Sequence, residues 1–339
     1  MKKILLMLGC LILTIHAGCR HGSLETPDQS VVEADTVSEK TWVEPITGMI
    51  FVWIPAGCCQ MGQTESGRNE LIASLGEAGY RKWFANELPR HEVCVDGFWM
   101  GKYEVTVAEF RKFIEATSHR MTAKDRNWSW CMTGLFEQKT GMTFAKPGFE
   151  QNDRHPVVHV SWFDANAMAE WLTKKNSSQF RLPTEAEWEY ACRGNTGTAR
   201  FWGNHPDDSC VFANAHDNTS LKARGFPWPH HNCEDGYVET APVGSYTANG
   251  FGLHDMLGNV FEWCRDSYSD DAYASHVVRN PFYSEKTGLR VVRGGGWYSA
   301  PGEMRCAIRR GKCPTNTDDA LGFRLIRIES SHIIMGSIQ

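Results

Sequence analysis

Three consecutive glycines follow a short β-branched stretch in residues 289–297, with the sequence LRVVRGGGW. Glycine adopts positive φ angles and permits close backbone approach, at a cost in chain entropy. A simple tight turn needs only one or two glycines, so the run predicts a specific backbone path after a buried strand at Val291 and Val292. A second strand is expected at 321–326, which leaves the polar, aperiodic segment 298–320 as the expected working surface. The alternative is a Gly-rich hairpin without function.

Composition limits the class of protein and of partner. The chain has 339 residues, 42% hydrophobic and 22% charged, which is typical of a globular protein with one large or two ordinary domains. Its net charge of -5 and the lack of a basic block argue against nucleic acid as a partner. The 13 tryptophans indicate an aromatic-rich fold with many loops.

The N-terminus has the pattern of an export signal. Lys2 and Lys3 precede an apolar run at 4–13, and Ala17 and Gly18 stand directly before Cys19, as in a bacterial lipobox. His16 departs from the leucine usual there, so ordinary secretion stays open. We predict an exported lipoprotein, held in the membrane by lipid on Cys19 and located at the cell surface or outer membrane. The expected parts are a signal peptide at 1–19, a flexible tether at 20–44, a domain at 45–329 and a tail at 330–339.

Export makes disulfides plausible among the later cysteines. Of the 12 cysteines, ten lie beyond Cys19, with no CxxC pair and no Cys/His spacing suited to zinc. Strands are expected at 49–57 and 91–100, and we expect Cys59 and Cys94 to sit in two neighbouring strands. The sequence does not determine the connectivity, and buried free thiols are the alternative.

Three capping boxes predict helix starts at Thr106, Ser161 and Thr184, each with an acidic residue three positions later. Apolar residues follow at helical spacing, and Gly194 suits the end of the third helix. Between the first strands, 65–86 has the pattern of a helical insertion.

The order of these and other motifs resembles the formylglycine-generating enzyme (sulfatase-modifying factor) family over about residues 48–328. The resemblance implies one α+β domain of the C-type-lectin-like type, with a small twisted antiparallel sheet, two main helices and many long loops. The motifs are Met61-Gly62, Pro89-x-His91, Tyr103-Glu-Val-Thr106, His155-Pro-Val157, Ser161-Trp162, RLPTEAEWEYA at 181–191, GNVFEW at 258–263, RGGGW at 293–297 and Gly322-Phe-Arg324.

Acidic loop residues suggest calcium sites, because Ca²⁺ takes six to eight oxygen ligands from carboxylates and carbonyls. Asp255 and Glu262 alone are a weak signal, and solvated loop acids are the alternative. The resemblance implies one or two calcium ions. The first set comprises the side chains of Asp255 and Glu262 with the carbonyls of Gly258 and Val260. The second comprises Asn214, the Ala215 carbonyl, Asp235 and the Tyr237 carbonyl.

The family's oxidase chemistry requires two copper-binding cysteines after the glycine-rich turn, since Cu(I) selects thiolates. Ser299 occupies the place of the first, and Cys306 matches a separate family cysteine, so no copper and no catalytic residue are expected. Motifs of serine hydrolases, P-loop proteins and zinc proteases do not occur. His230, His231 and Cys233 are more consistent with a solvated loop than with a metal site.

Three functions fit these observations. The first is a membrane-anchored binding protein for an unknown protein or cell-surface ligand, similar to the variable proteins of diversity-generating retroelements. The second is an exported enzyme of the same family with altered oxidase or modifying chemistry. The third is a structural lipoprotein of a surface or motility complex. The candidate ligand residues of the first are Tyr298, Ser299, Pro301, Ile308, Arg310, Gly311, Thr315, Thr317, Asp318 and Asp319.

Overall fold

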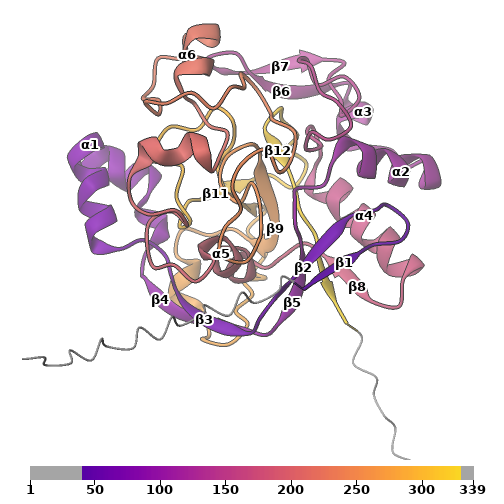
Figure 1. The fold of residues 1–339 in the computed structure, drawn as a ribbon, viewed down its shortest axis with the longest axis horizontal. Helices are drawn as coiled ribbons and strands as arrows, with labels where there is room; N and C mark the ends of the chain where they lie inside the picture. Colours follow the sequence, from indigo (N-terminus) through magenta and orange to yellow (C-terminus); the bar gives the residue numbers. More distant parts are fainter. Residues whose placement is uncertain (1–39, 330–339) are drawn as a thin grey trace, which may run out of the picture. The chain divides into compact units, whose positions relative to one another are not determined.

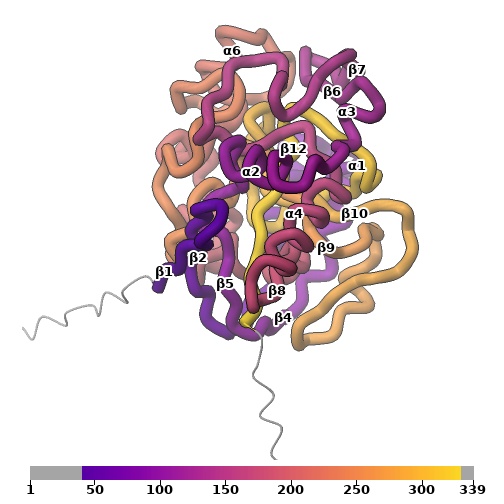
Figure 2. Tube along the Cα trace, turned by 90° about the vertical axis from the view of Figure 1, so that its right-hand side faces the viewer, coloured from indigo at the N-terminus to yellow at the C-terminus, as the bar shows by residue number. Residues whose placement is uncertain are grey.

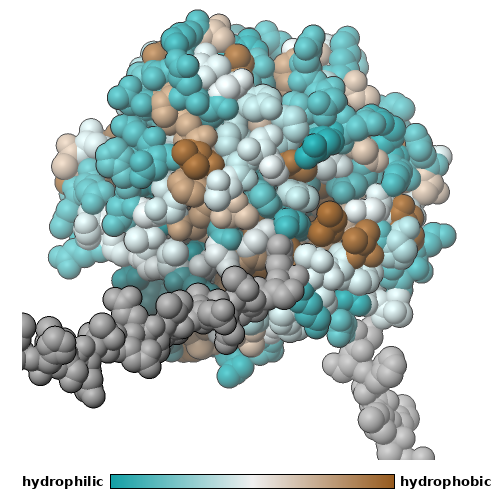
Figure 3. Space-filling view, viewed as in Figure 1, coloured by the Kyte–Doolittle hydropathy of each residue, from teal (hydrophilic) through white to brown (hydrophobic). Residues whose placement is uncertain are grey.

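The computed structural model describes residues 40–329. The predicted signal peptide, the lipidation site Cys19, most of the tether and the tail at 330–339 lie outside the described residues. Within 40–329, no helix is long and apolar enough to cross a membrane. On the face shown in Figure 3, apolar side chains occur in small groups separated by hydrophilic ones.

A five-stranded antiparallel sheet brings the two ends of the domain together. Its order is β1 (Thr41–Val43), β2 (Ile50–Ile54), β5 (Phe98–Gly101), β13 (Ile326–Ile328) and β8 (Gln179–Arg181) (Figure 1). β1 pairs with β2 from Thr41 to Val43, so the expected tether is wrong at its C-terminal end. These residues gain the ladder hydrogen bonds and packing that a free tether would lack.

A second, four-stranded sheet carries the glycine-rich turn. Its order is β11 (Arg309–Lys312), β10 (Arg290–Arg293), β9 (Phe261–Ser267) and β12 (Leu321–Gly322). Only β12 runs parallel to its neighbour. The strand predicted before the segment 298–320 is therefore confirmed, whereas the one predicted at 321–326 is divided between β12 at its start and β13, which begins at Ile326. However, β11 lies within that segment, which sequence periodicity had not indicated, and its antiparallel pairing with β10 draws the segment onto the sheet.

The helices begin where the capping boxes predict. They are α2 (Val107–Thr117), α4 (Trp162–Lys175) and α5 (Glu185–Arg193), with all three reciprocal caps formed and Gly194 ending α5 in the left-handed conformation. α2 and α4 pack against each other beside the five-stranded sheet, as Figure 2 shows. The expected insertion is α1 (Glu65–Trp83) followed by a 3₁₀ turn, Ala85–Glu87. The other short helices are α3 (Thr122–Arg126), α6 (Asn218–Arg224), Pro206–Val211 and Ala272–Ser275.

Two separate two-stranded antiparallel sheets complete the fold. They are β3 (Gly57–Met61) with β4 (His91–Val95), and β6 (Trp128–Met132) with β7 (Phe136–Thr140). β3 and β4 are neighbours, as predicted. Their register places Cys58 opposite Cys94 and Cys59 opposite Val93. Cys58 therefore forms the disulfide with Cys94, and Cys59 stays free. A second disulfide joins Cys210 to Cys233.

A fully buried ion network attaches α5 to the second sheet. Glu185 on α5 accepts hydrogen bonds from Arg293 on β10 (3.0 Å) and from Arg309 on β11 (2.7 and 2.8 Å). Glu189, one turn later, pairs with Arg293 and with Arg193. The side chains of all four residues in this network are fully buried: Glu185, Glu189, Arg293 and Arg309. The network therefore determines where the chain enters the glycine-rich turn.

Candidate functional site

The glycine-rich turn is held between two distant loops. Gly294 and Gly295 have φ angles of 93° and 79°, which a side chain would strain. A Cβ on Gly294 would also lie 3.2 Å from the Met256 carbonyl oxygen. The Trp297 indole donates to the Asp319 carbonyl at 3.0 Å, so the turn is tied to the start of β12.

Ser299 is fully buried at the position where the family's first copper ligand is expected. Its hydroxyl accepts a hydrogen bond from the Gly296 N–H at 3.1 Å, and its N–H donates to the Gly296 carbonyl at 2.8 Å. Cys306 lies elsewhere in the core, with its sulfur 3.3 Å from that of Cys192. A hydroxyl without a thiolate beside it is a poor donor set for Cu(I), so the residues present do not fit a copper centre.

The expectation that 298–320 is a displayed surface is wrong for six of its candidates. Tyr298, Ser299, Ile308, Thr317, Asp318 and Asp319 are buried, whereas Pro301, Arg310, Gly311 and Thr315 are half-buried. The cause is tertiary, because β11 joins the sheet and the β6–β7 hairpin covers the end of the segment. Trp130 on β6 donates its N–H to the Thr317 carbonyl, and the Ser129 hydroxyl donates to that of Thr317 at 2.8 Å.

The two aspartates at the end of the segment have different partners. Asp318 pairs with Lys312, and its second oxygen accepts from the Ala320 N–H. Asp319 accepts the Met132 N–H at 2.8 Å through Oδ2, while its buried Oδ1 has no hydrogen-bond partner among the described residues. Burial, with Asp318 nearby, raises the pKa of Asp319 to about 7. Such a carboxyl is a candidate functional group with a physical rationale.

Asp319 lines a pocket of about 310 Å³ between the β6–β7 hairpin and the glycine-rich turn. We call it the Trp297 pocket. Its walls include Met132, Lys139, Phe149, Glu239, Trp297 and Asp319. The Phe149 and Trp297 rings have centroids 6.3 Å apart at an interplanar angle of 66°. The pocket thus combines apolar walls with one unpaired carboxylate, and its size falls in the range of small-molecule sites.

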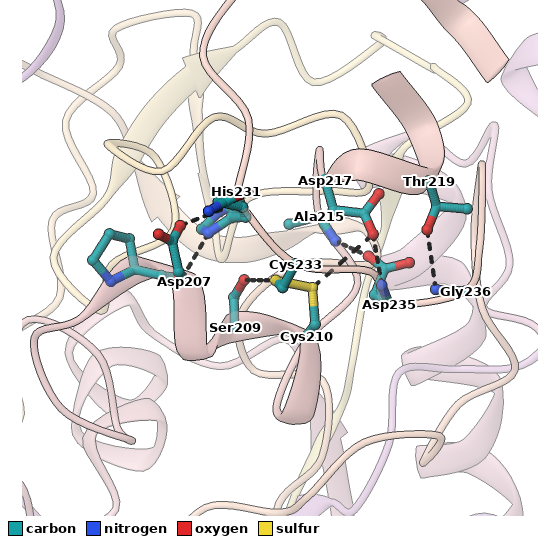
Figure 4. Close-up of a disulfide and its surroundings, with 12 residues drawn as sticks. Asp207, Ser209, Cys210, Ala215, Asp217, Thr219, His231, Cys233, Asp235 and Gly236 are labelled. Carbon is teal, nitrogen blue, oxygen red and sulfur yellow. Dashed lines mark hydrogen bonds between the residues drawn. A yellow bond between two sulfur atoms is a disulfide. The ribbon is translucent and has the colours of Figure 1, made fainter. Parts of the chain in front are cut away.

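Ala215 and Asp235, two of the residues expected around one calcium ion, lie beside the Cys210–Cys233 disulfide (Figure 4). The Asp235 carboxylate accepts the N–H groups of Ala215 (2.9 Å) and Tyr237 (2.8 Å). Burial, with Asp217 nearby, raises the pKa of Asp235 to about 7. The Asn214 amide nitrogen donates to the Glu239 carbonyl, which leaves its buried Oδ1 without a partner. A buried acceptor without a donor fits a cation ligand.

The first expected calcium set, around Asp255 and Glu262, contacts Arg324, which the sequence analysis gave only as part of the Gly322-Phe-Arg324 motif. Asp255 accepts the Gly244 N–H at 2.7 Å, and its buried Oδ1 has no partner. Burial raises the pKa of Asp255 to about 6. Glu262, by contrast, accepts hydrogen bonds from Arg324 at 2.6 Å and from the Trp188 indole at 2.7 Å. Asp255 fits a cation ligand, while Glu262 already has a counter-ion.

Glu104 is a further carboxylate at this place that sequence reasoning missed. It accepts from the Asn259 side chain at 2.7 Å and from the Val260 N–H at 3.2 Å. Burial, together with Asp255 and Glu262, raises the pKa of Glu104 well above its usual range. The available signal was an acidic residue inside the apolar motif at 103–106, where an unpaired charge is costly.

Within residues 40–329, no three side chains of the His, Cys, Asp and Glu types converge to hold a metal ion. Each calcium set would therefore depend on carbonyl and amide oxygens as well as carboxylates. The residues at 230–233, which the sequence disfavours as a metal site, have other partners. Cys233 is in a disulfide, and a ring nitrogen of His231 is hydrogen-bonded to the Pro206 carbonyl at 2.7 Å.

Comparisons with known proteins agree with this architecture. Residues 35–328 match the family model described as "Sulfatase-modifying factor enzyme 1-like domain". The chain is 31% identical over 334 residues to the formylglycine-generating enzyme of Mus musculus, covering 90% of this chain and 82% of the mouse protein. It is 29% identical over 316 residues to the inactive C-alpha-formylglycine-generating enzyme 2 of Bos taurus, covering 84% of this chain and 90% of that protein.

Solved structures show the same fold. PvdO from Pseudomonas aeruginosa superposes with a TM-score of 0.67 and 26% identity, over 85% of this chain and 98% of PvdO. Treponema denticola variable protein 1 superposes with a TM-score of 0.59 and 20% identity, over 86% of this chain and 99% of that protein. These likenesses confirm the expected α+β fold of the C-type-lectin-like type.

Proposed function

Because the chain belongs to the sulfatase-modifying factor family, we propose that it is a member that binds a ligand and does not generate formylglycine. In this proposal the protein is exported, anchored in the membrane through lipid on Cys19, and exposed to a protein or cell-surface ligand. The single observation that carries it is the replacement of the expected copper-binding thiolate by the buried Ser299. Serine supplies neither the soft donor nor the redox chemistry that the oxidation requires.

The ligand site of this proposal differs from the one expected from the sequence. Most of 298–320 is packed inside the fold, so a broad loop surface is a poor candidate. The Trp297 pocket is concave, has apolar walls and contains the unpaired carboxylate of Asp319. These are the general features of small-ligand sites. Arg310 and Gly311 line a separate hollow of about 350 Å³ beside Trp83 and Tyr268, which is a second place for contact with a larger partner.

In this proposal, bound calcium stabilises the loops that support the ligand site. Asn214 and Asp255 each have one buried oxygen without a hydrogen-bond donor, which a bound Ca²⁺ would satisfy. The Asn214 carbonyl accepts the Asn259 N–H at 2.8 Å, and the Asn259 carbonyl accepts the Trp297 N–H at 2.9 Å. Cation binding at Asn214 would thus stabilise the loop that supports the pocket wall.

Diversification by a retroelement is a further part of the proposal, and it applies to the half-buried candidates. The likeness to the treponemal variable protein, at 20% identity, shows the fold alone. In such proteins variable positions descend from asparagine codons, which cannot become codons for Glu, Met or Lys by changes at adenine alone. Glu303, Met304 and Lys312 would therefore be invariant positions within 298–320. Met304 is fully buried beneath the turn, which suits an invariant position.

An enzyme with altered chemistry is the second candidate function. Its supporting observation is the pKa of Asp319, raised to about 7 inside a pocket, since a general acid or base works best with a pKa near the working pH. The likeness to PvdO extends over nearly all of that protein, so the scaffold also occurs in a protein that does not carry the name formylglycine-generating enzyme.

The loss of formylglycine chemistry can be tested directly. We expect no aldehyde when the purified protein is incubated with copper and a peptide containing Cys-x-Pro-x-Arg, because Ser299 cannot bind Cu(I) as a thiolate. The mouse formylglycine-generating enzyme is the positive control, and mass spectrometry of the peptide is the readout. Aldehyde above the protein-free background would refute the proposed function.

Calcium binding should be visible in thermal unfolding. A ligand that binds only the native state adds RT ln(1 + [L]/Kd), about 2.7 kcal/mol at a hundredfold excess over Kd. We expect chelation to lower the Tm and calcium to restore it. Asp235→Asn should remove much of this response, because it neutralises the carboxylate that accepts the N–H of Ala215, the residue after Asn214. The exposed Asp208 is the matched control, since Asp208→Asn changes the same charge outside the site. Equal responses in both variants would count against the assignment.

A further inference from the structure

We propose that the Trp297 pocket binds the ammonium group of a small organic amine, with the Asp319 carboxylate as its counter-ion. This inference rests on the proposed function only in placing the ligand in this pocket. It adds the chemical class of the ligand. Three features of the pocket support it: the ion pairs of its charged side chains, the unpaired Asp319 oxygen and the chemistry of its walls.

Asp319 is the one charged side chain lining this pocket that has no ion-pair partner among residues 40–329. Lys139 pairs with Glu137, and Arg224 pairs with Glu239. The neighbouring Lys312 is paired with Asp318. The remaining unsatisfied charge is therefore negative, and a cation is the complementary ligand.

The Asp319 side chain is held in place and only 3% exposed. Oδ2 accepts the Met132 N–H at 2.8 Å, and the carbonyl of the same residue accepts the Trp297 indole N–H at 3.0 Å. Oδ1 has no donor. A buried acceptor left unpaired costs about 1–3 kcal/mol, and more when it is charged. A ligand that donates to Oδ1 would recover this cost.

The walls suit a cation attached to an apolar body. Trp297, Phe149 and Met142 line the pocket, and aromatic faces and thioethers are polarizable surfaces that attract ammonium groups and pack against hydrocarbon. A carboxylate ligand would meet Asp319 as a like charge. A bare metal ion is a poorer ligand here, since no three acidic, histidine or cysteine side chains converge within 40–329. An alkyl- or arylammonium ion satisfies both the carboxylate and the walls.

The test uses the full chain in detergent and 2-phenylethylamine as the probe, with 2-phenylethanol as its neutral isostere. Binding is measured by isothermal titration calorimetry and by saturation-transfer NMR. We expect the amine to bind at least tenfold more tightly than the alcohol at pH 8. Asp319→Asn should abolish this difference, because it removes the charge and keeps an oxygen to accept the Met132 N–H. Asp208→Asn is the control for surface charge and should bind like the wild type.

Each outcome decides the proposal. Equal affinity for amine and alcohol, or no binding of the amine by the folded wild type at millimolar concentration, would overturn it. Preference for a neutral polyol probe such as glucose over the amine would also overturn it and would favour a sugar ligand. None of these results would affect the proposed loss of formylglycine chemistry, which the peptide assay tests independently. If Asp319→Asn does not fold, the comparison of amine with alcohol on the wild type still decides.

Discussion

Tyr298→Ala is expected to lower the free energy of unfolding by about 3–5 kcal/mol, the usual cost of deleting a buried aromatic ring. The Tyr298 side chain is only 7% exposed. Its ring centroid lies 5.3 Å from that of Trp297, 5.6 Å from Phe136 and 6.2 Å from Phe261. The cavity would open between the glycine-rich turn, the β6–β7 hairpin and β9. Urea denaturation monitored by far-UV circular dichroism would measure the loss.

Tyr298→Phe is the matched control because it keeps the ring and removes only the hydroxyl. It should retain most of the stability lost in the alanine variant. This expectation reverses the one from sequence, in which Tyr298 was a candidate ligand residue on the working surface at 298–320. If Tyr298→Ala unfolds at the wild-type urea concentration, the ring is exposed in solution, and the original broad binding surface would again be favoured.

Glu185→Gln should cost a comparable 3–5 kcal/mol at neutral pH, because it leaves buried arginines with too little compensating charge. Glu185 accepts hydrogen bonds from both Arg293 and Arg309, and all three side chains are fully buried. Arg293 would still pair with Glu189, but Arg309 would lose its carboxylate. Glu77→Gln is the control, since the Glu77–Arg81 pair is exposed and such pairs contribute little.

The effect of Glu185→Gln should depend on pH in a defined direction. Burial alone would raise the pKa of Glu185, but Arg309 and Arg293 outweigh burial and lower it to about 2. A depressed pKa in the folded state means that this stabilisation is fully present above the unfolded pKa, about 4.3. It is lost as the pH falls towards 2. The difference between wild type and variant should therefore shrink between pH 5 and pH 2. A difference that stays constant over this range would show that Glu185 is not ionised in the folded protein.

Local features were predictable because the interactions that create them are local. The capping boxes at Thr106, Ser161 and Thr184 form between residues three positions apart, so the helix starts followed from the sequence. The strands around the glycine-rich turn followed from β-branched runs and from glycine's backbone freedom. The ordered motifs indicated the fold class, which the superposed structures confirm.

Features that depend on pairing between distant segments were not predictable. Whether Cys58 or Cys59 meets Cys94 depends on strand register, and a shift of one residue exchanges the two faces. Glu262 was expected to bind calcium, but its partner Arg324 comes from a segment 62 residues later. The seven-residue spacing of Asp255 and Glu262 did not reveal that competition.

The sequence by itself determined the chemical identity of the residue at 299, a serine where the family resemblance implies a copper-binding cysteine. It also determined the family and the local turns and caps. Only the tertiary structure decided what 298–320 does, because burial is a property of the segments that cover a residue. The β6–β7 hairpin and β11 bury Tyr298 and Asp318, and the same packing leaves one oxygen of Asp319 without a donor in a pocket.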